Sequence, residues 1–542
     1  MRIKKASFIS ALLFLFLNFQ VSSQRAKPGS QTNKVASQTT NGSSQTAKVS
    51  SQTAKLPRST PEAEGVSSKG IMEFLDAIST TKHEIHSIII LRHGKVIAEG
   101  WWNPYRPDLK HTLYSLSKSF TSTAVGFAVA EKKLSVNDKV TSFFPNKLPS
   151  TISTFLTDLK IRDLLSMTAG QDPDPTGPVV VTNDWVKSFF ATPVLNKPGA
   201  VFLYNSAATY MLSAIVQKVT GEKIIDYLTP RLFKPLGIVG MDWETDPMGI
   251  NTGGWGFRIK TEDIAKFAQL YLQKGKWNGQ QILPEGWVEE ATTSKIDNAP
   301  YDSQAKKDSS DWKQGYCYQF WRSRHNSYRG DGAFGQYALV LPEEDAVIAI
   351  TSETMDMQGE LNLVWKYLLP AMQVDSSVLN KNDAAVLKKR LTQLKLPLPA
   401  KPDSAFKIIS VSGKSFKIDS NEKKIEKISF TQNSAAIALT IKTNMNSYTL
   451  NFGNGKWIEG KTTLLGPSLV AAAKGHFEGL PPSQVAGSYI WKGPASLQMQ
   501  LRYIDSPHTE IMTFYFDGDK ISVDMLDSFK TPDKKVTLKG NR

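Results

Sequence analysis

The chain has 542 residues, enough for two or three domains, and its 40% apolar and 10% aromatic content excludes a globally disordered protein. A single cysteine, Cys317, excludes a disulfide scaffold and a cysteine-based metal centre. The formal net charge of +15 raises the question of a nucleic-acid partner, but residues 1–58 hold nine Lys and Arg and no acidic residue, which leaves only +6 for the rest. We therefore expect no nucleic-acid partner.

Residues 1–23 have the pattern of a secretory signal peptide. Basic residues stand within the first five positions, and the apolar run over 6–19 is too short to span a bilayer. Val21-Ser22-Ser23 offers small residues for cleavage. We expect the mature chain to begin near Gln24 and to be exported to the periplasm or the extracellular space. No later stretch predicts a transmembrane segment.

Residues 24–60 repeat a seven-residue unit that begins with Ser-Gln-Thr at Ser30, Ser37, Ser44 and Ser51. Such a repeat raises the possibility of a coiled coil, but its apolar residues are too few and too scattered for a helical seam. Because Ser, Gln and Thr dominate, the segment buries too little to offset its ordering entropy. We expect a disordered spacer.

Residues 61–373 mix helical and strand patterns. The strands lie at both ends of this region and the helices between them, which predicts an α/β domain whose terminal strands pair antiparallel. The expected helices are 71–78, 115–131, 161–166, 207–220 and 261–274, and the expected strands are 87–91, 95–98, 336–341 and 346–351.

Residues 374–403 are rich in Lys, Asp and Pro and predict a linker. Beyond them, residues 404–542 alternate apolar and polar residues, which is typical of strands. Asn454-Gly455 and Asp517-Gly518 are typical of hairpin turns. We expect an all-β C-terminal domain, either a sandwich or a partial barrel.

The stretch from His111 to Ser122 carries the strongest chemical signal. Ser115 opens a helical pattern and Lys118 follows three residues later, so both lie on one face of the helix. A serine hydroxyl becomes a good nucleophile only when a nearby base takes its proton, and a lysine serves as that base only if its pKa is lowered. The alternative is a serine that caps the helix beside a solvated lysine.

The context of this pair resembles the serine β-lactamase and penicillin-binding-protein superfamily, whose first motif is Ser-x-x-Lys. The resemblance runs along residues 61–371 and is greatest to the branch with class C enzymes, esterases, D-stereospecific peptidases and 6-aminohexanoate-oligomer hydrolases. The matching stretches begin at Ile85, Ile161, Thr261 and Gly335. The resemblance implies an α/β (α+β) catalytic domain, an antiparallel sheet with helices on both sides, beside the C-terminal all-β domain.

The family's second motif, Tyr-x-Asn, corresponds to Tyr204-Asn205-Ser206. The resemblance implies that Tyr204 shares a hydrogen-bond network with Ser115 and Lys118, and passes the serine proton to the leaving group. Ser206 replaces the usual asparagine and is expected to contact substrate with fewer hydrogen bonds, which puts recognition of a β-lactam side chain in doubt.

The third motif, Lys-Thr-Gly or His-x-Gly in relatives, corresponds to Gly332-Ala-Phe-Gly-Gln336, in which only the glycine is kept. We expect Phe334 and Gly335 to line the substrate site, and the backbone N–H groups of Ser115 and Gln336 to form the oxyanion hole. Ala333 removes a cation suited to a substrate carboxylate. Arg324 and Arg329, just upstream, are candidates to supply that charge, but as lone basic residues we expect them at the surface.

Together these features predict an exported serine hydrolase that cleaves an ester or amide in a small or peptide-like substrate, with Ser115, Lys118 and Tyr204 as catalytic residues. No cofactor and no metal ion are expected, since the seven histidines show no convincing ligand spacing and His83-x-x-His86 fits a loop. Two alternatives stay open. One is a D,D-peptidase or weak β-lactamase with the same mechanism, and the other is a non-catalytic binding protein on the same fold.

Overall fold

The computed structural model describes residues 55–400, 406–434 and 436–542. The predicted signal peptide and residues 24–54 of the predicted spacer lie outside this range. Within the described range, no helix is both long enough and apolar enough to cross a membrane.

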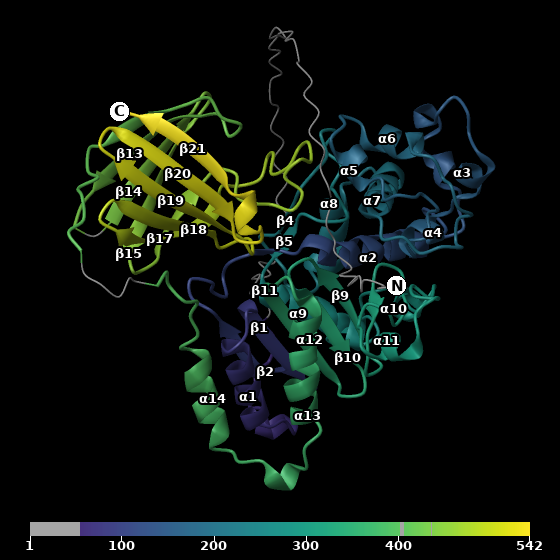
Figure 1. Ribbon diagram of the computed structural model, residues 1–542. Helices are drawn as coiled ribbons and strands as arrows, with labels where there is room; N and C mark the ends of the chain where they lie inside the picture. The colour runs from purple at the N-terminus through teal and green to yellow at the C-terminus, as the bar shows by residue number, and fades with distance from the viewer. Residues whose placement is uncertain (1–54, 401–405, 435) are drawn as a thin grey trace, which may run out of the picture. The chain divides into compact units, whose positions relative to one another are not determined.

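A six-stranded antiparallel sheet forms the centre of the N-terminal half (Figure 1). The first and last long strands pair with each other, with Ile90 opposite Ile348, so the predicted antiparallel pairing of terminal strands is confirmed. In spatial order the strands are β2 (Lys95–Trp101), β1 (Glu84–Arg92), β11 (Ala346–Glu353), β10 (Gln336–Leu341), β9 (Tyr328–Gly332) and β8 (Trp321–Arg322).

Helices cover both faces of this sheet, as expected from the run of apolar residues in β1. Ile88 and Ile90 pack in one core cluster with helix α1 (Ser68–Ser79), whereas Ile89 and Leu91 pack in the other with α9 (Thr261–Leu272). Because successive side chains of a strand point to opposite faces, a strand covered on both sides reads as continuously apolar.

A helical region lies beside the sheet and is organised around α2 (Ser117–Ala130), whose residues from Ser117 to Ala128 are all buried. A helix buried all round is a core element.

The remaining α-helices of the described residues are α3 (Thr154–Asp158), α4 (Ile161–Leu165), α5 (Thr176–Val180), α6 (Trp185–Ala191), α7 (Ser206–Thr220), α8 (Ile224–Leu228), α10 (Trp287–Thr292), α11 (Gln304–Asp308), α12 (Met357–Leu363), α13 (Leu369–Ala371) and α14 (Asp383–Leu391). Short strands are β3 (His111–Thr112), β4 (Asp242–Trp243), β5 (Phe257–Ile259), β6 (Lys276–Trp277) and β7 (Gln280–Gln281).

Ordered structure extends beyond the boundaries expected for the catalytic domain. Leu56 is buried in the core, and Arg58 forms ion pairs with Glu99 and Glu262, so the end of the predicted spacer packs on the domain. The predicted linker contains α14, whose Leu387 and Leu391 are buried in the same core cluster as α1. This part of the linker is thus a packed helix.

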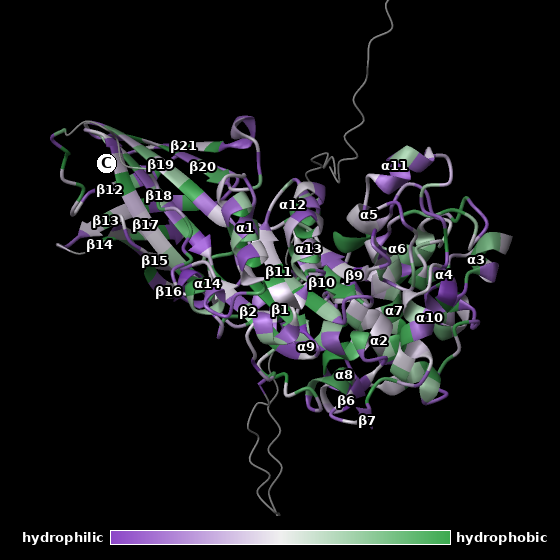
Figure 2. Cartoon of the chain, turned by 90° about the horizontal axis from the view of Figure 1, so that it is seen from below, coloured by the Kyte–Doolittle hydropathy of each residue, from purple (hydrophilic) through white to green (hydrophobic). Residues whose placement is uncertain are grey.

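The C-terminal strands form a barrel-like sheet of ten strands, which agrees with the predicted all-β domain (Figure 1). An additional pairing of β15 with β17 closes it. In Figure 2 polar and apolar residues mix along these strands, as expected for strands with one buried face. In spatial order they are β15 (Ser447–Asn454), β14 (Ala436–Thr443), β13 (Ile425–Gln432), β12 (Ser415–Ile418), β21 (Val536–Asn541), β20 (Lys520–Asp527), β19 (Thr509–Asp517), β18 (Ser496–Tyr503), β17 (Ser483–Gly493) and β16 (Ile458–Thr462).

One of the two predicted hairpin turns is confirmed. Asp517 pairs with Lys520 across the turn that contains Gly518. The prediction for Asn454-Gly455 is wrong, because β16, which follows this turn, pairs with β17 and not with β15. A turn signal shows that the chain reverses direction but does not say which strand becomes the neighbour.

We expect Gly126→Ala to destabilise the protein. A Cβ at this position of α2 would lie 2.4 Å from Trp287 Cε2, well inside van der Waals contact. Overpacking costs about 1–3 kcal/mol, which exceeds the gain of about 1 kcal/mol from the better helix propensity of alanine. Thermal unfolding should therefore begin at lower temperature. Gly460→Ala is the control, because its Cβ would meet Val485 at an ordinary 3.9 Å, and an equal loss in both variants would contradict the packing argument.

Candidate active site

Ser115 and Lys118 meet where a tight turn leads into the buried helix. Ser115 lies in the 3-10 turn Tyr114–Leu116 and is half-buried, and Lys118 lies in the first turn of α2. The Lys118 Nζ lies 3.0 Å from Ser115 Oγ. The spacing of three residues therefore places the two groups in hydrogen-bond contact, with the serine still accessible.

Lys118 is enclosed by polar atoms in an otherwise apolar core. Besides Ser115, its Nζ contacts Ser206 Oγ at 2.9 Å and the carbonyl oxygen of Gly254 at 2.8 Å. Only 1% of the residue is exposed, and burial lowers its pKa to about 7, while the charges of Asp174 and Asp331 act in the opposite direction. A substantial fraction of Lys118 is therefore neutral near pH 7.

Tyr204 lies beside this pair, just before helix α7. Asn205 caps that helix by accepting a hydrogen bond from the Ala208 N–H, which fixes the chain at Tyr204. Lys118 Nζ lies 4.9 Å from the centroid of the Tyr204 ring, and the Trp321 ring is stacked on it at 5.6 Å. Burial raises the pKa of Tyr204, and interaction with the Ser115 side chain opposes this. The phenol therefore keeps its proton near neutral pH.

The structure brings the three predicted catalytic residues together, and Ser206 with them. Ser206 is the first residue of α7 and the third residue of the second motif. As expected for that motif position, it lies at the site, in contact with Lys118. A serine in this position still accepts a hydrogen bond from the lysine.

The third-motif turn lies against the Ser115 turn through strand β9. A Cβ at Gly332 would lie 2.0 Å from the Leu113 carbonyl oxygen, so only glycine allows this approach. Gln336, the predicted oxyanion donor, is fully buried at the start of β10, one strand further away, and its side chain donates to the carbonyls of Ala333 and Ser352. Ala333, in contrast, is half-exposed. The geometry thus favours the Ala333 N–H over that of Gln336 for contact with substrate.

Phe334 and Gly335, the other predicted substrate contacts, are both buried and shape the turn. Phe334 has φ 68° and packs against Tyr114. Gly335 has φ 91°, and a Cβ there would lie 2.3 Å from Glu360 Oε2. Left-handed backbone is costly for a bulky residue such as Phe334, about 1–3 kcal/mol, so the surrounding packing must hold it.

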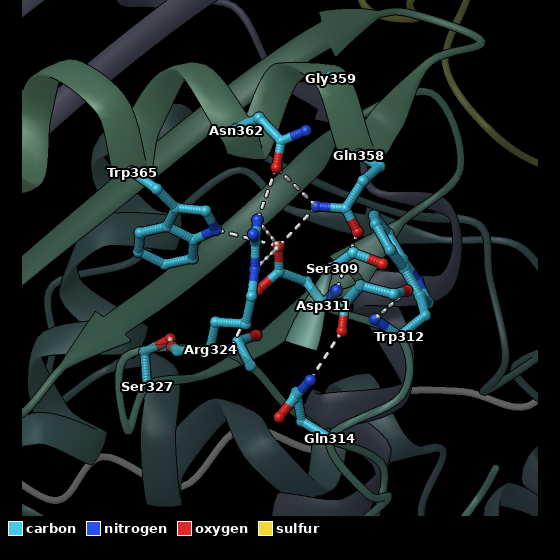
Figure 3. A network of polar contacts seen from close by, with 12 residues as sticks. Ser309, Asp311, Trp312, Gln314, Arg324, Ser327, Gln358, Gly359, Asn362 and Trp365 are labelled. Carbon is cyan, nitrogen blue, oxygen red and sulfur yellow. Dashed lines mark hydrogen bonds and ion pairs between the residues drawn. The ribbon is translucent and has the colours of Figure 1, made fainter. Parts of the chain in front are cut away.

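The two upstream arginines are both paired, and the expectation that they lie on the surface is wrong for Arg329, which is fully buried. Its guanidinium lies 2.8 Å from Asp331, and it donates to the backbone carbonyl of Asp311. Arg324 pairs with the buried Asp311 side chain, which also accepts from Gln358 and Trp365 (Figure 3). Neither arginine is free to bind a substrate carboxylate.

Several residues at the site carry no motif that the sequence analysis recognised. Asp174 and Asp331 act on Lys118 only through space, and Gly254 contributes a backbone carbonyl. Asp331 lies just before the third-motif stretch, and this position is the only sequence feature that pointed to it. Trp321 supports Tyr204 from a strand of two residues, too short for a recognisable alternation.

Comparison with known proteins identifies related sequences over the N-terminal half. The family model described as "Beta-lactamase" matches residues 81–371. The 6-aminohexanoate-dimer hydrolase of Paenarthrobacter ureafaciens is 26% identical over 310 residues, which cover 52% of this chain and 78% of that protein. Protein flp of Staphylococcus aureus (strain MW2) is 27% identical over 164 residues, or 28% of this chain and 33% of flp. The solved octameric penicillin-binding protein homologue from Pyrococcus abyssi is 16% identical and aligns with a TM-score of 0.46 over 87% of this chain and 99% of that one.

We expect Glu360→Gln to change how stability depends on pH. Glu360 is fully buried behind Gly335 and accepts a hydrogen bond from Ser352, and burial raises its pKa to about 8. An acid whose pKa is raised by folding stabilises the fold fully below its unfolded pKa of about 4.5, and this contribution is lost as pH rises through 8. Thermal unfolding from pH 5 to pH 9 should show a smaller decline for the glutamine variant. Parallel declines in the two proteins would rule out the role of Glu360.

Proposed function

The chain belongs to the β-lactamase family, and we propose that it is a serine hydrolase that cleaves an ester or amide through an acyl-enzyme on Ser115. The observation that carries the proposal is the contact of Ser115 Oγ with a buried lysine whose pKa is lowered to about 7. A lysine of ordinary pKa would be protonated and could not accept the serine proton. This contact also favours an enzyme over a non-catalytic binding protein.

In the first step, neutral Lys118 is the base. Its two N–H groups are directed to the Gly254 carbonyl and to Ser206 Oγ, which leaves the nitrogen lone pair for the Ser115 hydroxyl. As the proton moves to Nζ, Ser115 Oγ attacks the substrate carbonyl carbon. The Ser115 and Ala333 N–H groups donate to the oxygen that becomes negative. Ala333 replaces Gln336 here because β9 contacts the Ser115 turn and Ala333 is accessible.

In the second step, the tetrahedral intermediate collapses and its leaving group takes a proton. Tyr204 suits this transfer because its raised pKa keeps the phenol protonated, and Lys118 lies beside the ring to replace the proton. A water molecule then attacks the acyl-enzyme with the same groups in the reverse order. Water and substrate yield an acid and an alcohol or amine, and no cofactor enters the balance.

The charges around the site favour a substrate without a carboxylate. Asp174 and Asp331 both act electrostatically on Lys118, and Arg324 and Arg329 are held in ion pairs. Arg329 compensates the charge of Asp331, but a substrate carboxylate would meet Asp174 and would find neither Arg324 nor Arg329 free to pair with it. We accordingly propose an ester or amide that is neutral or positively charged, in preference to a penicillin or a peptidoglycan stem ending in a free carboxylate. Export by the predicted signal peptide forms part of the same proposal.

Replacement of the nucleophile tests the proposal directly. We expect the purified protein to hydrolyse a nitrophenyl ester and to gain the mass of one fluorophosphonate on Ser115. Ser115→Ala should lose both, with turnover reduced more than about 1,000-fold. Ser117→Ala, two residues further on, is the neighbouring control. Activity that survives in Ser115→Ala would overturn the proposal, and a stable penicillin adduct on Ser115 would favour the D,D-peptidase alternative.

The pH dependence of acylation tests the role of Lys118. The rate should rise with pH to a plateau, with its midpoint near pH 7, because Lys118 must be neutral to accept the proton. In Asp174→Asn the midpoint should move to lower pH, since the Asp174 carboxylate raises the pKa of Lys118. Asp533→Asn, at an exposed position on the barrel, should leave the midpoint unchanged. A pH midpoint that is the same in Asp174→Asn as in the wild-type protein would argue against Lys118 as the base.

A further inference from the structure

We propose that His508, a residue of the C-terminal barrel, is a positioning residue for the nucleophile. It contacts Tyr114 and Phe334, which lie next to Ser115 and Ala333, the residues whose N–H groups form the oxyanion hole. The inference rests on the proposed function in taking Ser115 as the nucleophile and the Ser115 and Ala333 N–H groups as the oxyanion hole. It assigns the barrel a part in the chemistry of a site whose catalytic side chains all come from the other half of the chain.

A chain of buried hydrogen bonds links the barrel to Tyr114. Tyr114 Oη lies 2.5 Å from His508 Nε2, and His508 Nδ1 lies 2.5 Å from Glu353 Oε1 at the end of β11. A carboxylate only accepts, so the Nδ1–H of the ring donates to Glu353, and in the tautomer with its proton on Nδ1 the Nε2 atom accepts the Tyr114 hydroxyl proton. Ser528 Oγ also donates to Glu353 Oε1, at 2.7 Å. Each hydrogen bond in this series thereby restricts the orientation of the next side chain.

Two of the residues that His508 contacts have a strained backbone. Tyr114 has φ 47° and Phe334 has φ 68°, both in the left-handed region that bulky residues rarely adopt. The His508 and Phe334 rings lie edge to face with their centroids 4.7 Å apart, and the centroids of the Phe334 and Tyr114 rings lie 5.5 Å apart. One imidazole therefore holds the two strained residues that flank the two proposed oxyanion donors. Such strain persists only where the surroundings enforce it.

The same barrel tip also binds the backbone that leads to Ser115. The Asp505 carbonyl accepts a hydrogen bond from the Thr112 N–H at 3.0 Å, and the Ser506 carbonyl accepts one from Tyr105 Oη at 2.9 Å. Arg258 pairs with the Asp505 carboxylate at 3.2 Å. The connection between β18 and β19 thus contacts the segment from Thr112 to Tyr114 at both of its ends, and His508 makes the contact nearest the nucleophile.

A second histidine of the barrel supplies a matched control. His476 Nδ1 lies 2.8 Å from Glu244 Oε2, so it too joins the barrel to the catalytic half through a buried histidine–carboxylate contact. None of its described contacts reaches Tyr114 or the third-motif turn. If the barrel served only to stabilise the fold, loss of either histidine would act alike.

The experiment compares Tyr114→Phe, His508→Ala, His508→Gln and His476→Ala in the full-length protein. Fluorophosphonate labelling of Ser115 and the kcat and KM for a nitrophenyl ester are measured for each, at a temperature where all are folded by circular dichroism. We expect His508→Ala to slow labelling and kcat by about 10–100-fold with KM nearly unchanged, since a misplaced oxyanion hole acts on the transition state. Tyr114→Phe should lose about tenfold, and His508→Gln should recover part of the rate, because its amide oxygen accepts the Tyr114 hydroxyl proton.

Two further measurements distinguish a positioning role of His508 from a purely stabilising one. The double variant Tyr114→Phe/His508→Ala should be no slower than the slower single variant within about twofold, because both changes break one chain of contacts. Hydrogen exchange of the amides from 109 to 120 should quicken in His508→Ala and stay unchanged in His476→Ala.

The outcomes distinguish this inference from the proposed function. If the wild-type protein is not labelled on Ser115, the proposed function fails, and hydrogen exchange still decides whether His508 orders the Ser115 segment. Wild-type rates and exchange in a folded His508→Ala would overturn the positioning role. So would rate losses in His508→Ala and His476→Ala that match each other.

Discussion

The burial of the Lys118 amine is the constraint on which the rest of the site depends. An ammonium group placed in an apolar core is costly unless polar atoms surround it or it gives up its charge. Here Ser115, Ser206 and the Gly254 carbonyl provide three partners, and the pKa still falls to about 7. In the proposed mechanism this pKa matters because a fully solvated lysine would stay protonated and could not accept the proton of Ser115. The buried helix α2 is what makes this environment possible.

Glycine and strained backbone then bring the other elements close enough to act. Gly332 lets β9 approach the Leu113 carbonyl, and Gly335 lets the following turn pass over Ser352 and Glu360. Between them, Phe334 adopts a conformation that glycine would take at lower cost. The turn keeps a large ring there because the ring contacts both Tyr114 and His508. Packing against neighbouring rings thus keeps Phe334 in a backbone conformation that would otherwise call for glycine.

Features that depend on local pattern could be predicted from the sequence. Helices α7 and α9 follow from the helical pattern of their residues, and the Ser115–Lys118 contact follows from helical spacing. The backbone donor that we propose for the oxyanion could not be predicted in the same way. The choice between Ala333 and Gln336 depends on which strand contacts the Ser115 turn, and strand register is a tertiary property. Glu353 and His508, 155 residues apart, meet only in the folded chain.

The packing of the barrel agrees with a role at its tip more than with a role in its interior. Inward side chains such as Phe416, Phe430, Phe514 and Phe516 contact one another, with ring centroids 5.2–6.5 Å apart, and belong to one core cluster. A barrel that holds a ligand needs inward positions left open, whereas these are filled by aromatic and branched residues. Such a barrel offers a packed core on which its connections are mounted. In the role that we propose for His508, the link between β18 and β19 holds the segment before Ser115 through its contacts with Thr112 and Tyr114.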